Sequence, residues 1–397
     1  MVSTAARGEA LVDAARALQP RILALSDQIE RDRGLPADLV DALYEAGLFT
    51  MLLPASLGGS ELDLPTFTLA VETLAQADGS VGWCIGQANG LAAYMAYLDR
   101  RGARDVFNGQ RVILANGPGD GNMPGRAVRV DGGYRVTGRW MFASGIGHAT
   151  WLLGVCHTYA GPNADPEPES QIDGRPGQRL MLFPKSSAEI HDVWHVSGLR
   201  GTGSQCFSVN DLFVPDGYQV HFSPAARQEP GPLYLFSNNG MFGPAFGSVS
   251  LGLAAASLDS ITDFAAGKVP RGMERSIREN ANVQTAVAVS RARHAAARAY
   301  LRTTLTDVWS SVCAEYALSD AQRAAVRLAA THATHESAAV VDTCYTLAGS
   351  NAIFEDRPFE RRFRDIHAVS QQLQARRNHY EHVGKFLLGL GPEQAFL

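Results

Sequence analysis

A change of pattern in the middle of the chain sets the strongest limit on its fold. From about Val112 to Tyr218, short segments rich in strand formers alternate with Gly, Pro and Asn turns, and Gly132-Gly133 in "VRVDGGYRVTG" indicates a hairpin. Before and after this block, apolar residues recur at helical spacing over long runs. An order of helices, strands and then long helices excludes a doubly wound sheet, in which strands and helices alternate.

The pattern predicts an α+β protein with a domain of each kind in sequence. We expect an N-terminal helical domain over 1–112, a β domain over 113–222 and a C-terminal helical domain over 223–397. A chain of 397 residues is long enough for more than one core. The β domain contains a Pro-rich loop, "PNADPEPESQIDGRPGQ". In the last domain a capping box, Ser319 to Gln322, opens a helix, and one further helix is predicted to carry "IHAVSQQLQARRNHYEHVGKFLLG".

Composition and local motifs exclude several classes of function. The net charge is −5 and no basic patch with interleaved aromatics occurs, so we expect no nucleic-acid partner. No secretory leader and no apolar run long enough to cross a bilayer stand out, and the 5 cysteines are scattered without a C-x-x-C pair. We therefore predict a cytoplasmic protein with small buried thiols, no membrane association and no metal site. No G-x-G-x-x-G follows a strand, which argues against a Rossmann nucleotide site.

Four segments carry a family resemblance that covers nearly the whole chain. "LPADLVDALYEAGLFTMLLPASLGGSELDLPT" resembles the N-terminal signature of the acyl-CoA dehydrogenase superfamily, and "FERRFRDIH" resembles a run near its C-terminus. Within that superfamily, "GGYRVTGRWMFASGIGHATW" and "WHVSGLRGTGSQCFSVNDLFVP" resemble the two-component flavin-dependent monooxygenases. The resemblance implies an N-terminal helical domain, a middle antiparallel β-barrel or sandwich, and a C-terminal four-helix bundle.

The same resemblance implies an activity and its partners. Such a protein is the oxygenase component of a pair. It takes FADH2 or FMNH2 from a separate flavin reductase and reacts it with O2. The resulting C4a-hydroperoxyflavin hydroxylates a small organic substrate or oxygenates its nitrogen or sulfur. The family also implies a homotetramer built as a dimer of dimers.

Residues at the end of one predicted strand are the first candidates for the site. Ser144 follows the strand in "FASG", and the resemblance places it beside the flavin N5 as a catalytic and cofactor-binding hydroxyl. Trp140 and Phe142 on the same strand either line the flavin or fill the β core, as strand aromatics usually do. His148 is a candidate active-site donor, although a lone histidine is more often structural.

A second group is predicted from the resemblance to meet the phosphate end of the flavin. In "GLRGTGS" an arginine and backbone N–H groups face an anion, or the glycines only allow a tight turn. "TLAGSNAIF" resembles the segment that reaches the flavin tail of a neighbouring subunit, or it is only a helix C-cap. One arginine on a predicted helix before a glutamine resembles the family's phosphate contact. The group comprises Arg200, Arg271, Gln284, Gly349, Ser350 and Asn351.

The stretch "RDIHAVSQQLQ" favours a monooxygenase over an acyl-CoA dehydrogenase. An acyl-CoA dehydrogenase needs a carboxylate base, which commonly follows the Arg-Asp pair by about two helical turns, but Gln371 and Gln372 stand here and cannot accept a proton. Relatives that hydroxylate phenols carry a histidine nearby. We therefore predict that Gln372 orients a substrate that needs no deprotonation, or a phenol or quinol that ionises easily. The alternatives are a dehydrogenase with its base elsewhere and a non-catalytic helical scaffold or binding module.

Overall fold

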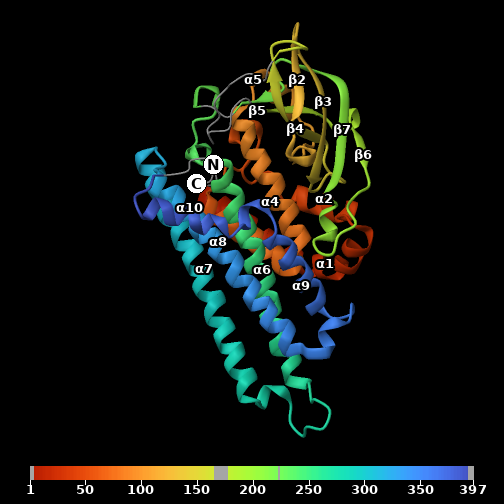
Figure 1. Ribbon diagram of the computed structural model, residues 1–397, viewed down its shortest axis with the longest axis vertical. Helices are drawn as coiled ribbons and strands as arrows, with labels where there is room; N and C mark the ends of the chain where they lie inside the picture. Colours follow the sequence, from red (N-terminus) through yellow and green to blue (C-terminus); the bar gives the residue numbers. More distant parts are fainter. Residues whose placement is uncertain (1–3, 165–177, 222–223, 392–397) are drawn as a thin grey trace.

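The computed structural model describes residues 4–164, 178–221 and 224–391. Most of the predicted Pro-rich loop, residues 165–177, lies outside the described residues. Figure 1 shows the β sheet at one end of the molecule, next to the N-terminal helices, and the long C-terminal helices extending away from it.

Among the N-terminal helices, α4 lies in the middle of the molecule, and nearly all of its residues are buried. Asp78 separates α3 from α4, and its carboxylate accepts the N–H groups of Ser80 at 2.8 Å and Val81 at 3.1 Å, as an N-cap does. Asp78 thus ends α3 and begins α4. Helix α4 packs against α3, α6 and β1, so its residues meet both the bundle and the sheet. The helices are α1 Thr4–Asp32, α2 Ala37–Glu45, α3 Leu64–Ala77, α4 Gly79–Tyr94 and α5 Arg100–Phe107.

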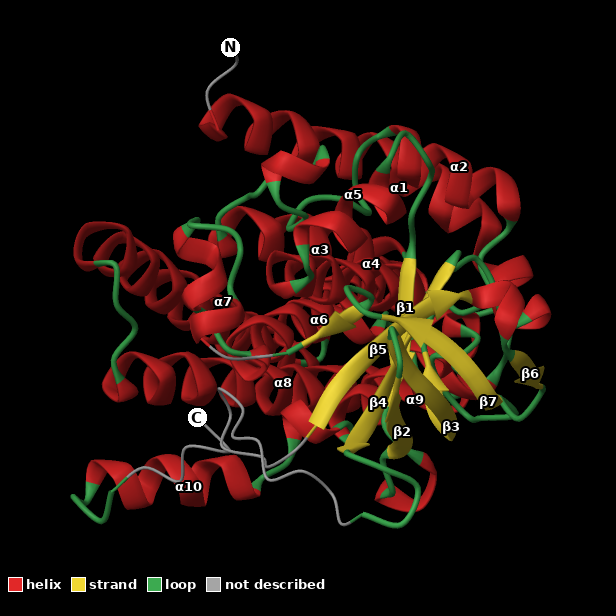
Figure 2. Cartoon of the chain, turned by 90° about the horizontal axis from the view of Figure 1, so that it is seen from above, coloured by secondary structure: helices red, strands yellow, loops and turns green. Residues whose placement is uncertain are grey.

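The middle block forms one sheet in the order β6-β7-β3-β2-β4-β5-β8, with β1 paired to β4 (Figure 2). The predicted hairpin is present, with Val130 opposite Gly133 between β2 and β3. Most pairs are antiparallel as expected, but β1 and β2 run parallel to β4, so the sheet is mixed. The strands are β1 Leu114–Gly117, β2 Gly125–Val130, β3 Gly133–Ala143, β4 Trp151–Tyr159, β5 Gln178–Pro184, β6 Glu189–His191, β7 Gln205–Pro215 and β8 Gln219–Val220.

The C-terminal helices form the expected bundle. Helix α6 packs on α8, α8 on α7, and α9 on both α6 and α8. The predicted capping box opens α8, where Ser319 N donates to Gln322 Oε1 at 2.7 Å. The fold class implied by the resemblance is therefore confirmed. The helices are α6 Asn238–Gly267, α7 Ala281–Glu315, α8 Asp320–Ala348, α9 Pro358–Ser370 and α10 Asn378–Leu387.

Two helix predictions in this part were wrong. The final helix is interrupted, because α9 ends at Ser370 and Gln372 takes an extended backbone (φ −71°, ψ 153°) before a short 3₁₀ turn and α10. Arg271 does not lie on a helix either. Pro270 and Gly272 (φ +80°) hold the α6–α7 connection as a loop, and α7 begins only after the N-cap Asn280.

Helix α6 corrects the prediction that no run is long enough to cross a bilayer. By length and composition it passes that test, but 94% of its most apolar window is buried inside the molecule. It is the core helix of the bundle. The cysteines are free thiols, of which Cys313 is exposed and the others are buried.

Candidate functional site

The hydroxyl of Ser144 lies where α4, the end of β3 and the start of β7 meet. Its side chain is 7% exposed. Trp83 of α4 donates its indole N–H to Ser144 Oγ at 2.9 Å, and Ser204 Oγ lies 2.7 Å from the same oxygen. Ser144 and Ser204 are brought together because β3 pairs with β7, with Ala143 opposite Gln205.

The hydroxyl contacts continue into the turn before β7. Ser204 Oγ is 2.7 Å from Thr202 Oγ1, which donates to the carbonyl of Leu199 at 2.8 Å. Thr202 and Ser204 are each 2% exposed. The backbone ties the two ends together, because Gly145 N donates to the Thr202 carbonyl at 2.8 Å. A buried chain of hydroxyls thus ends at Ser144.

An amide pair adjoins this chain. Gln87 lies one turn beyond Trp83 on α4, on the same helix face, and its Nε2 donates to Asn116 Oδ1 of β1 at 2.8 Å. Strand β1 runs close to β3 here, since a Cβ on Gly117 would lie only 1.7 Å from the Met141 carbonyl. The side-chain amides and Ser144 therefore belong to one polar region.

Aromatic side chains border the same region. The Trp83 ring stacks on Phe246 of α6, with centroids 3.9 Å apart and planes inclined by 9°. Phe242, one turn earlier on α6, stacks on Phe246 at 5.7 Å. We call Trp83, Phe242 and Phe246 the aromatic wall. Its rings belong to the buried hydrophobic core, and Trp83 joins them to the Ser144 hydroxyl.

The two aromatic residues predicted on β3 have different roles. Trp140 is 0% exposed, stacks on Phe207 at 5.0 Å and donates its N–H to the Val155 carbonyl, so of the two roles left open for it the structure favours a place in the β core. Phe142 is 57% exposed and has φ +58°, an unusual backbone conformation for a bulky residue. Such strain often marks a functional position, and Phe142 alone of the two offers a ring face to a ligand.

His148 packs behind the backbone that follows Ser144. Its ring centroid is 5.6 Å from that of Phe49, and its Nε2 would lie 2.9 Å from a Cβ on Gly145. Burial, with a smaller contribution from the positive charge of Lys185, lowers the pKa of His148 to about 4. The imidazole is therefore neutral at physiological pH, and its role as a donor stays a prediction.

Arg200 points away from Ser144. Its Nε donates to the Val196 carbonyl at 2.8 Å, and its Nη1 lies 3.4 Å from Glu30 of α1. It lines an open cleft of about 820 Å³, whose walls also include Arg364 and Glu360. The structure therefore assigns Arg200 to ion pairing between α1 and the turn before β7, and its predicted contact with the flavin has no support from this geometry.

The remaining phosphate-end candidates gather at the end of the bundle remote from the sheet (Figure 1). Asn351 accepts from Lys268 Nζ at 2.6 Å, which joins the end of α8 to the end of α6. Gln284 Nε2 donates to the Arg278 carbonyl at 2.9 Å on the adjoining loop. We call Arg271, Gln284, Gly349, Ser350 and Asn351 the remote cluster. Within one chain these residues lie near each other and not near Ser144.

The structure also redirects the prediction for Gln372. Its Oε1 accepts from Gln374 N at 2.6 Å, so it caps its own turn. The glutamine that enters the protein is Gln374, which is 6% exposed, accepts from Arg327 and donates to Asn239 at 3.1 Å. The structure thus buries Gln374, and the role of Gln372 in orienting a substrate stays a prediction.

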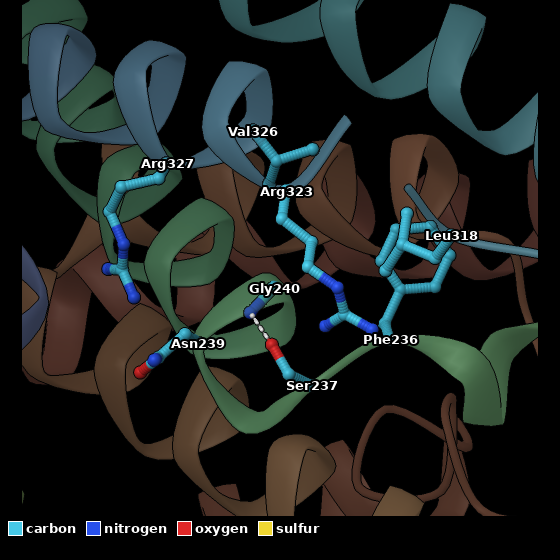
Figure 3. A pocket seen from close by; sticks show the side chains of 8 residues that line it. All are labelled: Phe236, Ser237, Asn239, Gly240, Leu318, Arg323, Val326 and Arg327. Atoms are coloured by element: carbon cyan, nitrogen blue, oxygen red, sulfur yellow. Dashed lines mark hydrogen bonds between the residues drawn. The ribbon is translucent and has the colours of Figure 1, made fainter. Parts of the chain in front are cut away.

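Arg327 and Gln374 adjoin a small cavity at the start of α6. Figure 3 shows Arg323 and Arg327 of α8 reaching toward Ser237, Asn239 and Gly240. The cavity holds about 10 Å³, which is room for about one water molecule. Burial lowers the pKa of Arg327 to about 10, so the guanidinium remains charged at neutral pH.

The residues around Ser144 fit a reduced flavin. A reduced isoalloxazine has an N–H at N5, a polar pyrimidine edge and a flat ring. Ser144 already has Trp83 and Ser204 as neighbours and retains room for one more hydrogen bond, because a hydroxyl offers one hydrogen and two lone pairs. Gln87 and Asn116 supply amides, and Phe142 supplies an exposed ring.

Comparisons with known proteins give a consistent result. The models "Acyl-CoA dehydrogenase, N-terminal domain" and "Acyl-CoA dehydrogenase, C-terminal domain" match residues 6–103 and 245–376. The chain is 28% identical to indole-3-acetate monooxygenase of Acinetobacter baumannii over 94% of this chain and 92% of that protein. It is 29% identical to the HsaA oxygenase subunit of a flavin-dependent monooxygenase of Mycobacterium tuberculosis over 88% of each. The crystal structure of the M. tuberculosis HsaA monooxygenase is similar with a TM-score of 0.88 and 26% identity, over 98% of this chain and 100% of that one.

Proposed function

Because the chain belongs to the acyl-CoA dehydrogenase superfamily, in its branch of two-component flavin-dependent monooxygenases, we propose that it hydroxylates a small aromatic substrate beside Ser144. It is an oxygenase component that uses reduced flavin and O2, with a separate reductase as the source of the flavin. The rival dehydrogenase and scaffold interpretations are not favoured.

The aromatic wall is the observation that carries the choice of substrate. Trp83 bonds to Ser144 through its N–H and stacks on Phe246 through its ring, so one residue borders both the hydroxyl and the apolar surface. Aromatic rings pack well against flat apolar ligands. Support also comes from the relative named indole-3-acetate monooxygenase, whose name describes an aromatic substrate.

Each residue then has a defined task. Bound reduced flavin supplies the electrons that activate O2. Ser144 accepts a hydrogen bond from the flavin, and Trp83 fixes the position of Ser144. Phe242 and Phe246 orient the substrate ring and, being 6% and 2% exposed, help to exclude water from the site. His148, neutral at physiological pH, completes the packing behind Ser144.

A single-turnover experiment tests the substrate class. Protein and reduced FMN or FAD are mixed without oxygen, one compound is added, and O2 is admitted. Indole-3-acetate and its saturated counterpart cyclohexaneacetate form a matched pair, and resorcinol is a third probe. We expect hydroxylated product and little peroxide with at least one aromatic compound. Full release of the oxygen as peroxide with every aromatic compound would contradict the proposal.

We also propose that the protein is a cytoplasmic homotetramer, a dimer of dimers, in which the remote cluster meets the flavin of a neighbouring subunit. Support comes from exposed apolar side chains next to that cluster, Ile353 at 64% and Phe354 at 54%. Free thiols suit a reducing compartment. Sedimentation of the purified protein tests the assembly, and a monomer that binds reduced flavin with full affinity would contradict it.

A further inference from the structure

We propose that Thr202 and Ser204 fix Ser144 as a hydrogen-bond acceptor, so that the site distinguishes reduced from oxidised flavin at N5. The inference rests on the proposed function for the presence of flavin. The direction in which the hydrogen bonds point is argued from the contacts between the hydroxyl groups of Ser144, Ser204 and Thr202. Thr202 and Ser204 are positioning residues, because they act on the ligand only through Ser144.

The number of available hydrogens determines the direction of the hydrogen bonds between Trp83 and the Leu199 carbonyl. The contacts run from Trp83 Nε1 to Ser144, then to Ser204, Thr202 and the Leu199 carbonyl, at 2.9, 2.7, 2.7 and 2.8 Å. The indole N–H can only donate and the carbonyl can only accept. One indole hydrogen and three hydroxyl hydrogens must serve these four contacts. Every contact receives a hydrogen only if all of them point from Trp83 toward Leu199.

The reverse direction is unfavourable at the Leu199 end. If Thr202 donated to Ser204, its oxygen would face the Leu199 carbonyl oxygen at 2.8 Å with no hydrogen between them. Burial intensifies that repulsion, because Thr202 and Ser204 are each 2% exposed and water does not screen them. The Ser144 hydrogen is therefore committed to Ser204.

The turn that carries the Leu199 carbonyl is itself held in place. Leu199 has φ +52°, a left-handed conformation that is costly for a side chain with a Cβ. Its N–H donates to Asp365 Oδ1 of α9 at 2.6 Å, and Arg364 donates to the Ser197 carbonyl. A Cβ on Gly198 would lie 2.2 Å from the Arg364 carbonyl, so the turn and α9 are in close contact. The acceptor at the end of the chain thus has a fixed position.

A committed Ser144 hydrogen has a consequence for the ligand. Ser144 retains one lone pair, with which it accepts from the N–H at N5 of a reduced flavin. The N5 of an oxidised flavin has no hydrogen and presents a lone pair of its own. Two lone pairs then face each other, so the oxidised form is disfavoured. This preference suits an enzyme that receives reduced flavin and releases oxidised flavin.

Anaerobic binding tests this inference without turnover. Dissociation constants for reduced and oxidised FMN are measured by quenching of tryptophan fluorescence, and their ratio is the readout. Thr202→Val removes the acceptor for Ser204, which can then turn and donate to Ser144. Ser204→Ala removes the acceptor for Ser144 directly. Each change frees the Ser144 hydrogen for oxidised N5 and should lower the preference for reduced flavin by about tenfold. Thr202→Ser, which keeps the hydroxyl, should retain it.

The outcomes separate the inference from the function on which it rests. Thermal unfolding is followed for each variant, and two different variants guard against local misfolding of one. An unchanged ratio in both Thr202→Val and Ser204→Ala would overturn the fixed polarity while leaving the flavin function intact. A wild-type protein that binds both redox forms equally would overturn the inference, and one that binds neither would overturn the function as well.

Discussion

The Ser144 region and the remote cluster belong to the same predicted cofactor site, yet the chain builds them differently. Around Ser144, side chains from α4, β1 and β3 and from the turn before β7 are buried and joined by hydrogen bonds. In the remote cluster, Arg271 and Ser350 are exposed, and their loops join only the ends of α6 and α8. The contrast agrees with the proposal that the reaction end is completed within one chain and that the remote cluster meets the flavin of a neighbouring subunit.

Substitution of Ser144 should lower product formation more than any other change proposed. A smaller loss than in the other variants would contradict the assignment of the reaction end to the Ser144 region. Ser144→Ala removes the acceptor for the flavin and leaves the indole N–H of Trp83 buried without its partner. A buried unsatisfied group costs about 1–3 kcal/mol, so we expect roughly 5- to 150-fold less product per reduced flavin. The measurement is product and peroxide in a single turnover.

A buried serine outside the region serves as the control for that change. Ser257 of α6 is 2% exposed and donates to the Leu253 carbonyl at 2.8 Å. Ser257→Ala should leave the ratio of product to peroxide unchanged. Equal uncoupling in both variants would show that Ser144 acts only through stability.

A smaller effect is expected when only the donor to Ser144 is removed. Trp83→Phe keeps a ring against Phe246 but deletes the N–H, so about 1 kcal/mol of positioning is lost and product per flavin falls about fivefold. Trp309 of α7, which stacks on Phe236, provides the matched Trp309→Phe control. Product per flavin as high as in the wild type would show that the Trp83 N–H does not position Ser144.

The pH dependence of stability tests the contact between α9 and the turn that borders the Ser144 region. Burial raises the pKa of Asp365 to about 7, and the neighbouring Asp78 charge adds to the shift. The folded protein therefore holds a proton that the unfolded chain, with a pKa near ~3.9, releases, so stability falls as the pH rises from about 4 to 7. Urea midpoints should fall less steeply over this window in Asp365→Asn. The exposed Asp263 gives the control Asp263→Asn, which should match the wild type.

The smallest effect on a single chain is expected in the remote cluster. Asn351→Ala should change the free energy of unfolding by less than about 0.5 kcal/mol, because the residue makes a partly exposed contact with Lys268. If a neighbouring subunit uses Asn351, reduced-flavin affinity should nevertheless fall a few-fold. Lys268→Met breaks the same pair. Equal losses of reduced-flavin affinity in the two variants would show that Asn351 acts through its contact with Lys268 and does not itself bind the flavin.

Local signals predicted much of the fold but only part of the site. The α–β–α order, the hairpin at Gly132-Gly133 and the capping box at Ser319 follow from short-range patterns, and the structure confirms them. Ser144 stood in a motif. Trp83 did not, because its contact with Ser144 spans 61 positions and arises from packing of α4 against the sheet. The sequence offered one sign of this contact, namely that Trp83 and Gln87 lie one turn apart in a helix whose other residues are mostly small or apolar.

The sequence could not decide the surroundings of Trp140 and Gln372, for a related reason. Alternation along a strand assigns residues to faces but does not say which face is covered, and Trp140 proved to be in the core. Gln372 lies where a helix was expected, and the backbone turned there instead, so that Gln374 became the buried amide. Side-chain direction depends on backbone breaks that residue patterns mark only weakly.

The hydroxyl chain has a further consequence for proton traffic. A row of hydroxyls conducts protons when both ends can exchange them with water or with an acid or base. Here the inner end is the Leu199 carbonyl, an amide oxygen that neither supplies nor retains a proton near neutral pH, and the Thr202 and Ser204 links are 2% exposed. The chain therefore insulates. It gives Ser144 a polar environment without opening a path for protons through Ser204 and Thr202.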